Sequence, residues 1–430
     1  MRYIADLHIH SKYSRACSPR LELENIAEGC RKKGVDIVSC ADFTHPKWFA
    51  GMKEKLVEAG NGLYELKKSP SNPTLEKGEA VRPVYFLLST EISCIYSKGG
   101  KVRRLHLVIF APTMEVVEKI NNKLATLGKL ASDGRPILGL DAKELLKIVL
   151  EIDQRCMVIP AHAWTPWFAV FGSKSGFDSL EECFDELAPH IYAIETGLSS
   201  DPAMNWRLSK LDNVILVSNS DAHSLEKIGR EANVFEIDDS VSNFYDEICR
   251  ILKEKDKNKF LYTIEFYPEE GMYHFDGHRA CKIKMSPEET KKKKNICPVC
   301  NRPMTIGVMN RVDELADRPP GAKPKNFIPY KSLVGLDNTI SEALGVAGKK
   351  TKAAVREYEN LISKGGSELR ILLDLSYNEL SQITLPEIVE GIRRNREGKV
   401  KIEPGYDGVY GTVRLFSEDE KKENKQTKLL

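Results

Sequence analysis

Histidine and carboxylate side chains recur where the apolar, strand-like runs of this sequence end. The opening run, residues 3–10, alternates in character with a period of two, which points Asp6, His8 and His10 to one face of a strand. Two imidazoles and a carboxylate on one face can bind a divalent ion. Side chains of the same kinds follow or interrupt later apolar runs: Asp42, His45, Glu91, His106, His162, Glu195, Asp221 and His223. A lone histidine at a strand end is usually a core residue, but seven such strand ends in succession indicate a metal-dependent hydrolase.

Mixed imidazole and carboxylate ligands favour particular ions and a particular chemistry. Imidazole favours transition metals and carboxylate tolerates harder ions, so we expect two or three divalent ions of zinc, manganese, magnesium or iron. Two ions held roughly 4 Å apart can lower the pKa of a water molecule, orient it for in-line attack and neutralise phosphoryl charge. A phosphate ester is therefore the expected substrate class.

A second group of ligands lies in residues 278–300. His278 and Cys281, then Cys297 and Cys300, form two ligand pairs joined by a loop, which is typical of a closed tetrahedral structural zinc site. His274 competes as the fourth ligand, and a metal-free or redox-active cysteine pair is the alternative. Between residues 278 and 331, thirteen Lys and Arg stand against five Asp and Glu. Beside a phosphoesterase site, this basic segment favours nucleic acid as the partner.

Aromatic residues crowd the loop that follows His162. They either pack as a lid over the site or form a surface on which a base taken out of its helix can stack. Polar residues near the next strand end could add base-edge and phosphate contacts. The predicted DNA and base contacts are Trp164, Trp167, Phe171, Glu195, Ser199, Asp201, Asn205 and Arg207.

Composition bounds the setting of the protein. The chain has 430 residues, 41% of them hydrophobic, and a net charge of only +2. No charged-then-apolar leader opens it and no apolar run reaches the roughly 18 residues of a membrane span, so we expect an intracellular, cytoplasmic, nucleoid-associated protein without a membrane partner. Ten cysteines without a secreted pattern suggest a reducing compartment, and abundant charged residues with only three glutamines suggest a thermophile.

The elements that must position these residues alternate between apolar runs and amphipathic segments. We expect helices over residues 21–33, 52–58, 115–130 and 141–152, separated by parallel strands joined by right-handed crossovers. A βα barrel is favoured over a doubly wound sheet because polar residues from many strand ends must converge. The predicted parts are a catalytic barrel (1–240), a charged connecting helix (241–261), a zinc-binding module (262–317), a helical DNA-binding domain (318–416) with helices over 339–344, 351–363, 367–375 and 385–396, and a disordered tail (417–430).

The ligand series resembles the polymerase and histidinol phosphatase (PHP) family of phosphoesterases. The matching residues are Asp6–His10, Glu91–Ser93, His106, His162 and Asp221–His223. The resemblance implies a distorted seven-stranded βα barrel, with one ion on His8, His10, Glu91 and Asp221, and a second on Glu91, His106 and His162. It implies a third ion on His45 and His223, and catalytic roles for Glu91, Asp221 and His223. The sequence departs from the family where the loop after the first strand reads Ser14-Arg-Ala-Cys17, with Cys17 as the substitute ligand, and where two residues separate Asp42 from His45.

Nearly the whole chain resembles endonuclease Q, a family known mainly from archaea. The residues that carry this resemblance are Asp6–His10, 195–201, 220–223, 273–278 with the cysteines, and 404–408. It implies a DNA repair enzyme that flips deaminated bases (uracil, hypoxanthine, xanthine) or abasic sites out of double- or single-stranded DNA. The enzyme would cut on the 5′ side of the lesion with a metal-activated hydroxide, leaving a 3′-hydroxyl and a 5′-phosphate.

Other readings of the sequence stay open. A PHP phosphatase for small phosphomonoesters explains the barrel but leaves the zinc segment and the helical region without a role. A DNA exonuclease shares nearly every feature and differs in needing a free end, and a non-catalytic DNA-binding protein would have no need for an open two-metal centre. Residues 426–429, Gln-Thr-Lys-Leu, match the first half of a box that binds the sliding clamp.

Overall fold

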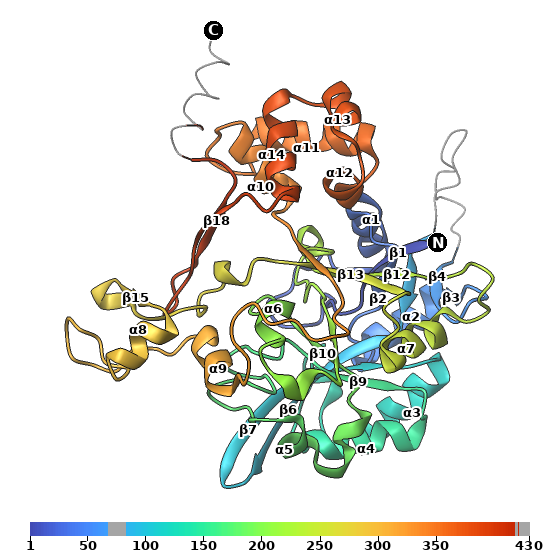
Figure 1. Cartoon of the computed structure of the whole chain (residues 1–430). Helices are drawn as coiled ribbons and strands as arrows, with labels where there is room; N and C mark the ends of the chain where they lie inside the picture. The colour runs from blue at the N-terminus through green and yellow to red at the C-terminus, as the bar shows by residue number, and fades with distance from the viewer. Residues whose placement is uncertain (68–82, 418–419, 421–430) are drawn as a thin grey trace.

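The structure, a computed structural model, describes residues 1–67, 83–417 and 420. It has three parts: a large α/β unit, a cluster of helices above it, and a small unit to one side (Figure 1). The mixed α/β fold with a helical C-terminal region is confirmed. The sliding-clamp box and most of the predicted tail lie outside the described residues. Nowhere in the described part of the chain is a helix long and apolar enough to cross a membrane.

The α/β unit is built on one large sheet and two smaller ones. The large sheet has the order β16 (Tyr330–Ser332), β13 (Phe260–Glu265), β12 (Ala232–Glu236), β1 (Arg2–Asp6), β2 (Ile37–Ser39), β5 (Tyr85–Leu87), β4 (Tyr64–Leu66) and β3 (Leu56–Glu58). The second has the order β8 (Ile137–Leu138), β6 (Ser89–Lys98), β7 (Lys101–Phe110) and β9 (Met157–Pro160), and the third pairs β10 (Ala193–Glu195) with β11 (Ile215–Val217). Because these three sheets are not hydrogen-bonded into one, a closed seven-stranded barrel stays a prediction.

Parallel pairing throughout this unit, expected from the sequence, is wrong. β6 and β7 form an antiparallel hairpin, and β12 is antiparallel to both β1 and β13. The hairpin turns at Gly99 and Gly100, which both have positive φ (62° and 73°). A two-residue turn of this kind matches the twist of antiparallel strands and favours glycine at both positions. The hairpin places Glu91 and His106 on neighbouring strands, with no helix between them.

Helices cover the sheets and mostly follow their predicted ranges. They are α1 (Leu23–Lys33), α2 (Pro46–Lys55), α3 (Met114–Ala125), α4 (Ala142–Ile152), α5 (Leu180–Phe184), α6 (Pro202–Asn205) and α7 (Phe244–Glu254). The helix predicted over 52–58 is wrong beyond residue 55, because Leu56–Glu58 pairs with Tyr64–Leu66 as strand β3. The connecting helix predicted over 241–261 does not lead away from the catalytic unit. It is α7, whose Phe244, Ile248 and Leu252 are buried in the core beneath the sheets, and β13 then extends the large sheet.

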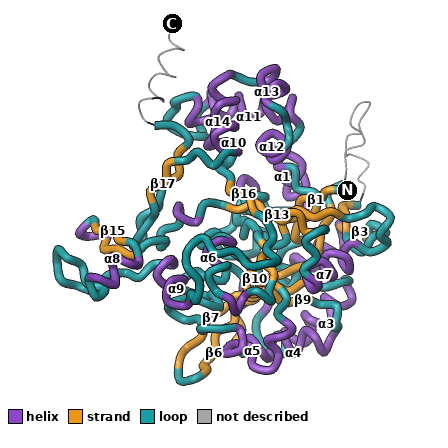
Figure 2. The backbone as a smooth tube through the Cα atoms, in the orientation of Figure 1, coloured by secondary structure: helices purple, strands orange, loops and turns teal. Residues whose placement is uncertain are grey.

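The two smaller parts follow in the chain. The side unit contains β14 (Asp276–His278), β15 (Ile283–Met285), α8 (Pro287–Lys292) and α9 (Val308–Leu315). The helical part contains α10 (Leu336–Ala343), α11 (Lys352–Gly365), α12 (Glu368–Leu373), α13 (Tyr377–Ile383) and α14 (Pro386–Arg396), and β17 (Lys401–Glu403) and β18 (Thr412–Arg414) run from it toward the side unit (Figure 2). Helix α13 was not predicted, although its capping box of Ser376 and Glu379 is a readable start signal.

Candidate metal centre

The first ligand group gathers residues from three separate strand ends. His8 and His10 follow β1, Glu91 lies in β6, and Asp221 follows β11. Their ligand atoms all lie within 4.8 Å of one another. His10 Nε2 is 3.3 Å from Glu91 Oε2 and 3.0 Å from Asp221 Oδ1, and His8 Nε2 is 3.6 Å from Glu91 Oε2. The sequence predicted this set, and the structure brings it together.

The second group shares Glu91 with the first. Glu91 Oε1 lies 2.9 Å from His106 Nδ1 and 3.2 Å from His162 Nε2. In the hairpin, Glu91 pairs with Val108 and Ser93 with His106. Every second residue of a strand points to the same face of the sheet, so Ser93 shares the face of Glu91. Residues paired across two strands also share a face, so His106, the partner of Ser93, projects from the same side as Glu91. One carboxylate therefore faces two ligand groups, one with each oxygen, which is the geometry of a bridging ligand.

Several buried atoms at this centre have no other use in the fold. His8 Nε2, His10 Nε2 and Asp221 Oδ1 are buried and make no hydrogen bond within the described residues. An unpaired buried polar atom costs about 1–3 kcal/mol, so natural proteins seldom keep three together without a ligand. Imidazole nitrogens and carboxylate oxygens are a donor set for divalent transition metals. The residues present therefore fit divalent ions.

Two buried carboxylates behind the rings orient the histidines. Glu195 Oε1 lies 3.0 Å from His8 Nδ1, and Glu195 Oε2 accepts a hydrogen bond from the His162 backbone at 2.8 Å. Asp42 Oδ1 lies 3.0 Å from His10 Nδ1. A carboxylate on one ring nitrogen fixes the other nitrogen as the ligand atom and raises its basicity. Glu195 was predicted as a DNA contact, and the structure instead places it, fully buried, behind His8.

The charges at the centre keep its carboxylates ionised. Burial raises the pKa of Glu91, but the charges of His106, Arg135 and His8 lower it more, and the net pKa is well below the ordinary value. For Asp221, too, burial is outweighed, by the close approach of the His10 ring and the nearby histidine charges, and its pKa is lowered. Burial lowers the pKa of the His106 ring to about 4, against the opposing effect of Glu91. Burial disfavours the charged forms of His8 and His10, but the charge of Glu195 on His8 and of Asp42 on His10 raises both pKa values well above the ordinary value, so metal binding would displace protons from these rings.

Arg135 reaches the same centre and was missed from the sequence. It lies just before β8, and its Nη1 is 2.9 Å from Glu91 Oε2. Its side chain is 23% exposed, so it touches both the buried carboxylate and the solvent side of the site. Guanidinium groups match phosphate geometry well. The only signal for Arg135 in the sequence is its place in the turn-like segment 133–136, which carries no ligand pattern.

The predicted third-ion ligands do not join these groups. His45 is the residue just before α2, where its side chain makes no capping hydrogen bond, and its ring stacks on that of Tyr13 with ring centroids 4.2 Å apart. The ring centroid of His223 is 4.7 Å from that of His10, and its Nδ1 is 2.8 Å from the backbone oxygen of Asp221. Asp6, expected beside His8 and His10 as a ligand, accepts hydrogen bonds from the backbone of Ser220 and Gly229 instead.

Most of the predicted DNA contacts are used inside the protein. Trp164 and Phe171 are each 1% exposed and pack together, and the Trp164 ring donates a hydrogen bond to Asn205. Asp201 caps α6, and Arg207 pairs with Asp313. Trp167, in contrast, is 40% exposed, and Ser199 lines a cavity beside it. An aromatic loop can be recognised from the sequence, but which of its rings face inward depends on tertiary packing.

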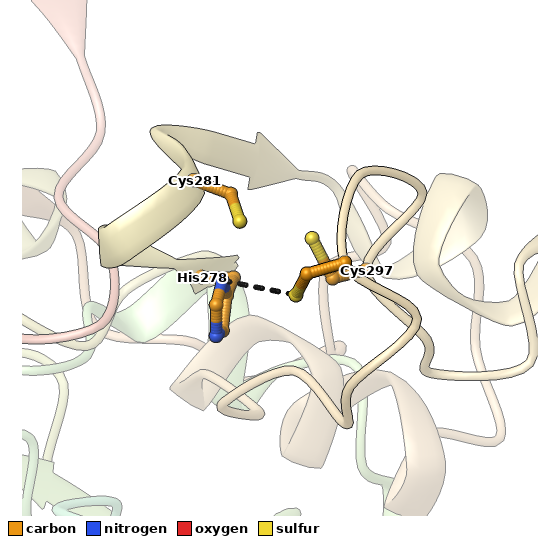
Figure 3. A group of neighbouring side chains, drawn as sticks. His278, Cys281 and Cys297 are labelled. Atoms are coloured by element: carbon orange, nitrogen blue, oxygen red, sulfur yellow. Dashed lines mark hydrogen bonds between the residues drawn. The ribbon is translucent and has the colours of Figure 1, made fainter.

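The cysteine segment forms a third ligand group in the side unit. The ligand atoms of His278, Cys281, Cys297 and Cys300 all lie within 4.8 Å of one another. The side chains of the first three point toward one another in Figure 3. His278 is on β14 and Cys281 ends the turn after it, while the other two cysteines lie on the loop after α8. His274, the competing ligand, is not in this group. Two cysteine-containing pairs on two loops fit a tetrahedral zinc ion.

Comparisons with known proteins extend over nearly the whole chain. Residues 335–399 match the family described as MJ0043 C-terminal domain. The Methanocaldococcus jannaschii protein MJ0043 is 34% identical over 254 residues, which are 59% of this chain but only 31% of that relative, so this chain spans about a third of its length. The structure is similar to the lesion-specific endonuclease PfuEndoQ from Pyrococcus furiosus, with 29% identity, a TM-score of 0.82, and coverage of 96% of this chain and 95% of that one. It is also similar to endonuclease Q in complex with a 27-mer duplex substrate with an abasic lesion at the active site, with 30% identity, a TM-score of 0.81 and 98% coverage of both chains.

The fold and the shared-carboxylate centre define a metal-dependent hydrolase of the nuclease class. The identity and coverage of the second comparison fix the family. This chain belongs to the endonuclease Q family.

Proposed function

We propose that this protein is a DNA repair endonuclease that cuts the phosphodiester on the 5′ side of deaminated bases and abasic sites. Its substrates would be double- or single-stranded DNA carrying uracil, hypoxanthine, xanthine or an abasic site. The observation that carries this proposal is the bridging position of Glu91, between two ligand groups, in a chain that is similar along its whole length to endonuclease Q. The abasic duplex bound by that relative supports the lesion as substrate.

The residues of the centre would divide the work of hydrolysis. His8, His10, Glu91 and Asp221 would hold one ion, and Glu91, His106 and His162 a second. When bound, such ions activate water and neutralise charge on phosphoryl oxygens. The water oxygen would bond to the phosphorus on the 5′ side of the lesion as the bond to the 3′ oxygen of the preceding nucleotide breaks. The products would be a 3′-hydroxyl and a 5′-phosphate.

Arg135 would hold the phosphoryl group during this step. Its guanidinium already sits at the rim of the centre and remains partly exposed, so a phosphate oxygen can approach it without a change of fold. A fixed positive charge aimed at developing negative charge stabilises the transition state more than the ground state. A third ion on His45 and His223 stays a proposal; His223 Nδ1 lies 3.5 Å from Asp221 Oδ1 of the first ligand group.

Basic surfaces outside the centre could hold the flanking DNA. A cavity of about 750 Å³ lies between α1, the loop after His223 and α11 of the helical part. Six basic residues line it, beside four carboxylates: Arg20, Lys32, Lys33, Lys227, Lys349 and Lys350, with Glu28, Glu226, Asp337 and Glu359. Arg20, Lys32 and Lys349 form ion pairs with these carboxylates, and the excess positive charge of the lining is two. Binding of a phosphate backbone to this excess charge would weaken as salt rises. The side unit would bind the flanking DNA at a second place.

The test uses three substrates and one double variant. A covalently closed circular duplex with one deoxyuridine should be nicked once, an undamaged circle should stay intact, and a small phosphomonoester should release no phosphate. Replacing His8 and Asp221 by Ala should abolish the nick, whereas His190→Ala, at the end of the turn Asp185–His190 and outside the ligand groups, should not. An intact lesion circle whose DNA is degraded once it has been linearised would identify an exonuclease, and phosphate release without any nick would identify a phosphatase. Either result would overturn the proposal.

A further inference from the structure

Asp6 joins the two ends of the loop that carries Asp221. This loop covers residues 220–229, between β11 and β12. Asp6 Oδ1 accepts a hydrogen bond from the backbone N–H of Ser220 at 3.0 Å, and Asp6 Oδ2 accepts one from the backbone N–H of Gly229 at 2.8 Å. The Asp6 side chain is fully buried, so water does not compete for either bond. One carboxylate thus closes the base of the loop, with one oxygen on each end.

The same loop lies against the chain segment that carries the two histidine ligands of the first group. The Asp221 N–H donates a hydrogen bond to the His8 carbonyl at 3.0 Å. The His10 N–H donates one to the Ala222 carbonyl at 3.1 Å. Asp6 is the last residue of β1, so its position is fixed by the strand that leads directly into His8. Its carboxylate therefore ties the loop to β1 and sets how close Asp221 lies to the histidines.

The backbone of Asp221 is in a conformation that needs such support. Its φ is +45°, in the left-handed region that residues other than glycine seldom occupy. A residue in this region costs conformational energy, and the conformation persists only where the surrounding structure holds it. In this conformation Asp221 Oδ1 lies 3.0 Å from His10 Nε2 and 3.9 Å from His8 Nε2. A relaxed backbone would turn the carboxylate away from both rings.

We propose that Asp6 is a positioning residue of the first metal site. By closing the loop, it holds Asp221 against the two histidines, so that the first ligand group can bind one ion. This inference rests on the metal-binding part of the proposed function. Asp6 lies outside the ligand groups, and both of its oxygens already accept backbone hydrogen bonds. The second ligand group lies on β6, on β7 and after β9, and its affinity for metal should not depend on Asp6.

Replacing Asp6 by Asn removes this support with almost no change in size. The amide group of Asn has one oxygen that accepts and one NH₂ group that donates. Both partners of Asp6 are backbone N–H groups, which can only donate, so in either orientation the NH₂ group faces a donor. One end of the loop then loses its hydrogen bond, and Asp221 is no longer held at a fixed distance from the histidines.

The experiment measures Mn²⁺ binding to apoproteins by calorimetric titration in two backgrounds. Mn²⁺ is used because thiolates favour softer ions, so the cysteines of the side unit contribute little. The His106→Ala background lacks a ligand of the second group and reports the first, whereas the Asp221→Ala background reports the second. Asp6→Asn should lower the affinity about ten-fold in the His106→Ala protein and leave it unchanged in the Asp221→Ala protein. Val149→Ala, at a buried position in α4, is the control for a general loss of stability and should change the affinity in neither background.

Hydrogen exchange of the unsubstituted protein tests the same arrangement, whether or not Asp6→Asn folds. The amides of Ser220 and Gly229 should exchange far more slowly than the amide of the exposed Glu226 in the same loop, because both donate to a buried carboxylate. Equal exchange rates for the three amides would overturn the inference.

The outcomes of the titration separate this inference from the proposed function. An unchanged Mn²⁺ affinity of Asp6→Asn in the His106→Ala background would overturn the inference, and so would a parallel fall in both backgrounds. The proposed function is decided separately by the nicking of the lesion circle. A wild-type protein that binds Mn²⁺ but leaves this circle intact loses the proposed function, while a selective fall in affinity still establishes the role of Asp6.

Discussion

The role of Glu195 can be decided by replacing it with Gln. Both of its oxygens accept hydrogen bonds from fixed donors: Oε1 faces His8 Nδ1 and Asn219 Nδ2, at 3.0 and 2.9 Å, and Oε2 faces the His162 backbone N–H at 2.8 Å. The amide group of Gln must therefore turn its NH₂ toward a donor in either orientation. Replacing a carboxylate that orients a metal-binding histidine typically lowers metal affinity about 10–100-fold, or about 1.4–2.8 kcal/mol. The unsatisfied buried donor should also lower the free energy of unfolding by about 1–3 kcal/mol.

Three measurements on Glu195→Gln distinguish orientation of His8 from contact with DNA. Calorimetric titration of the apoprotein with Mn²⁺ or Zn²⁺ gives the loss of metal affinity, urea denaturation gives the loss of stability, and titration with a deoxyuridine duplex gives the DNA affinity. Glu236→Gln, an exposed strand carboxylate, is the matched control and should change none of the three. Unchanged metal affinity together with weaker binding of a deoxyuridine duplex would refute the structural argument, because Glu195 would then act as the base contact predicted from the sequence.

Three further substitutions test other parts of the molecule. Arg135→Ala removes the guanidinium at Glu91 and should lower kcat about 10–100-fold on lesion duplexes, measured in single-turnover assays; unchanged kcat would contradict a role in holding the phosphoryl group. Cys281→Ala should lose one zinc ion per chain by elemental analysis, while Cys249→Ala, in α7, should lose none; equal metal content in both variants would count against a zinc site. Burial raises the pKa of the Glu265 carboxyl to about 8, so the folded protein holds a proton that the unfolded chain releases above pH 4.5, and the free energy of unfolding should fall as pH rises from about 4.5 to 8. Glu265→Gln should lessen this fall in denaturation curves at pH 5 and pH 8, and parallel behaviour of the two proteins would contradict the assignment.

The ligands of the candidate centre were readable from the sequence because metal chemistry restricts residue types strongly. His8 and His10 follow from the period-two pattern of a strand, and the same pattern wrongly added Asp6. Glu91 and His106 were selected for their types, although they were expected on separate parallel strands. The actual hairpin depends on Gly99 and Gly100, a local turn signal that was available in the sequence.

The supporting residues could not be found in this way. A carboxylate that binds the metal and one that hydrogen-bonds the other nitrogen of a ligand histidine are both Asp or Glu. Both also follow a strand in the sequence. Asp42 and Glu195 differ from Asp221 only in the positions that the tertiary structure gives their side chains. Arg135 lies in a turn without any pattern, and its contact with Glu91 is set entirely by tertiary structure. Trp164 and Trp167 are three residues apart in one loop, yet one is buried and the other is exposed.

The central claim is that one bridging carboxylate supports a cut directed by a lesion. The most direct measurement is gel mapping of the products from an end-labelled duplex with one internal deoxyuridine, using the wild type and Glu91→Gln in the same Mn²⁺ buffer. We expect a single wild-type cut on the 5′ side of the lesion, with a 3′-hydroxyl and a 5′-phosphate, and no cut by Glu91→Gln although the variant remains folded. Equal cutting by Glu91→Gln, or wild-type cutting that ignores the lesion, would contradict the central claim.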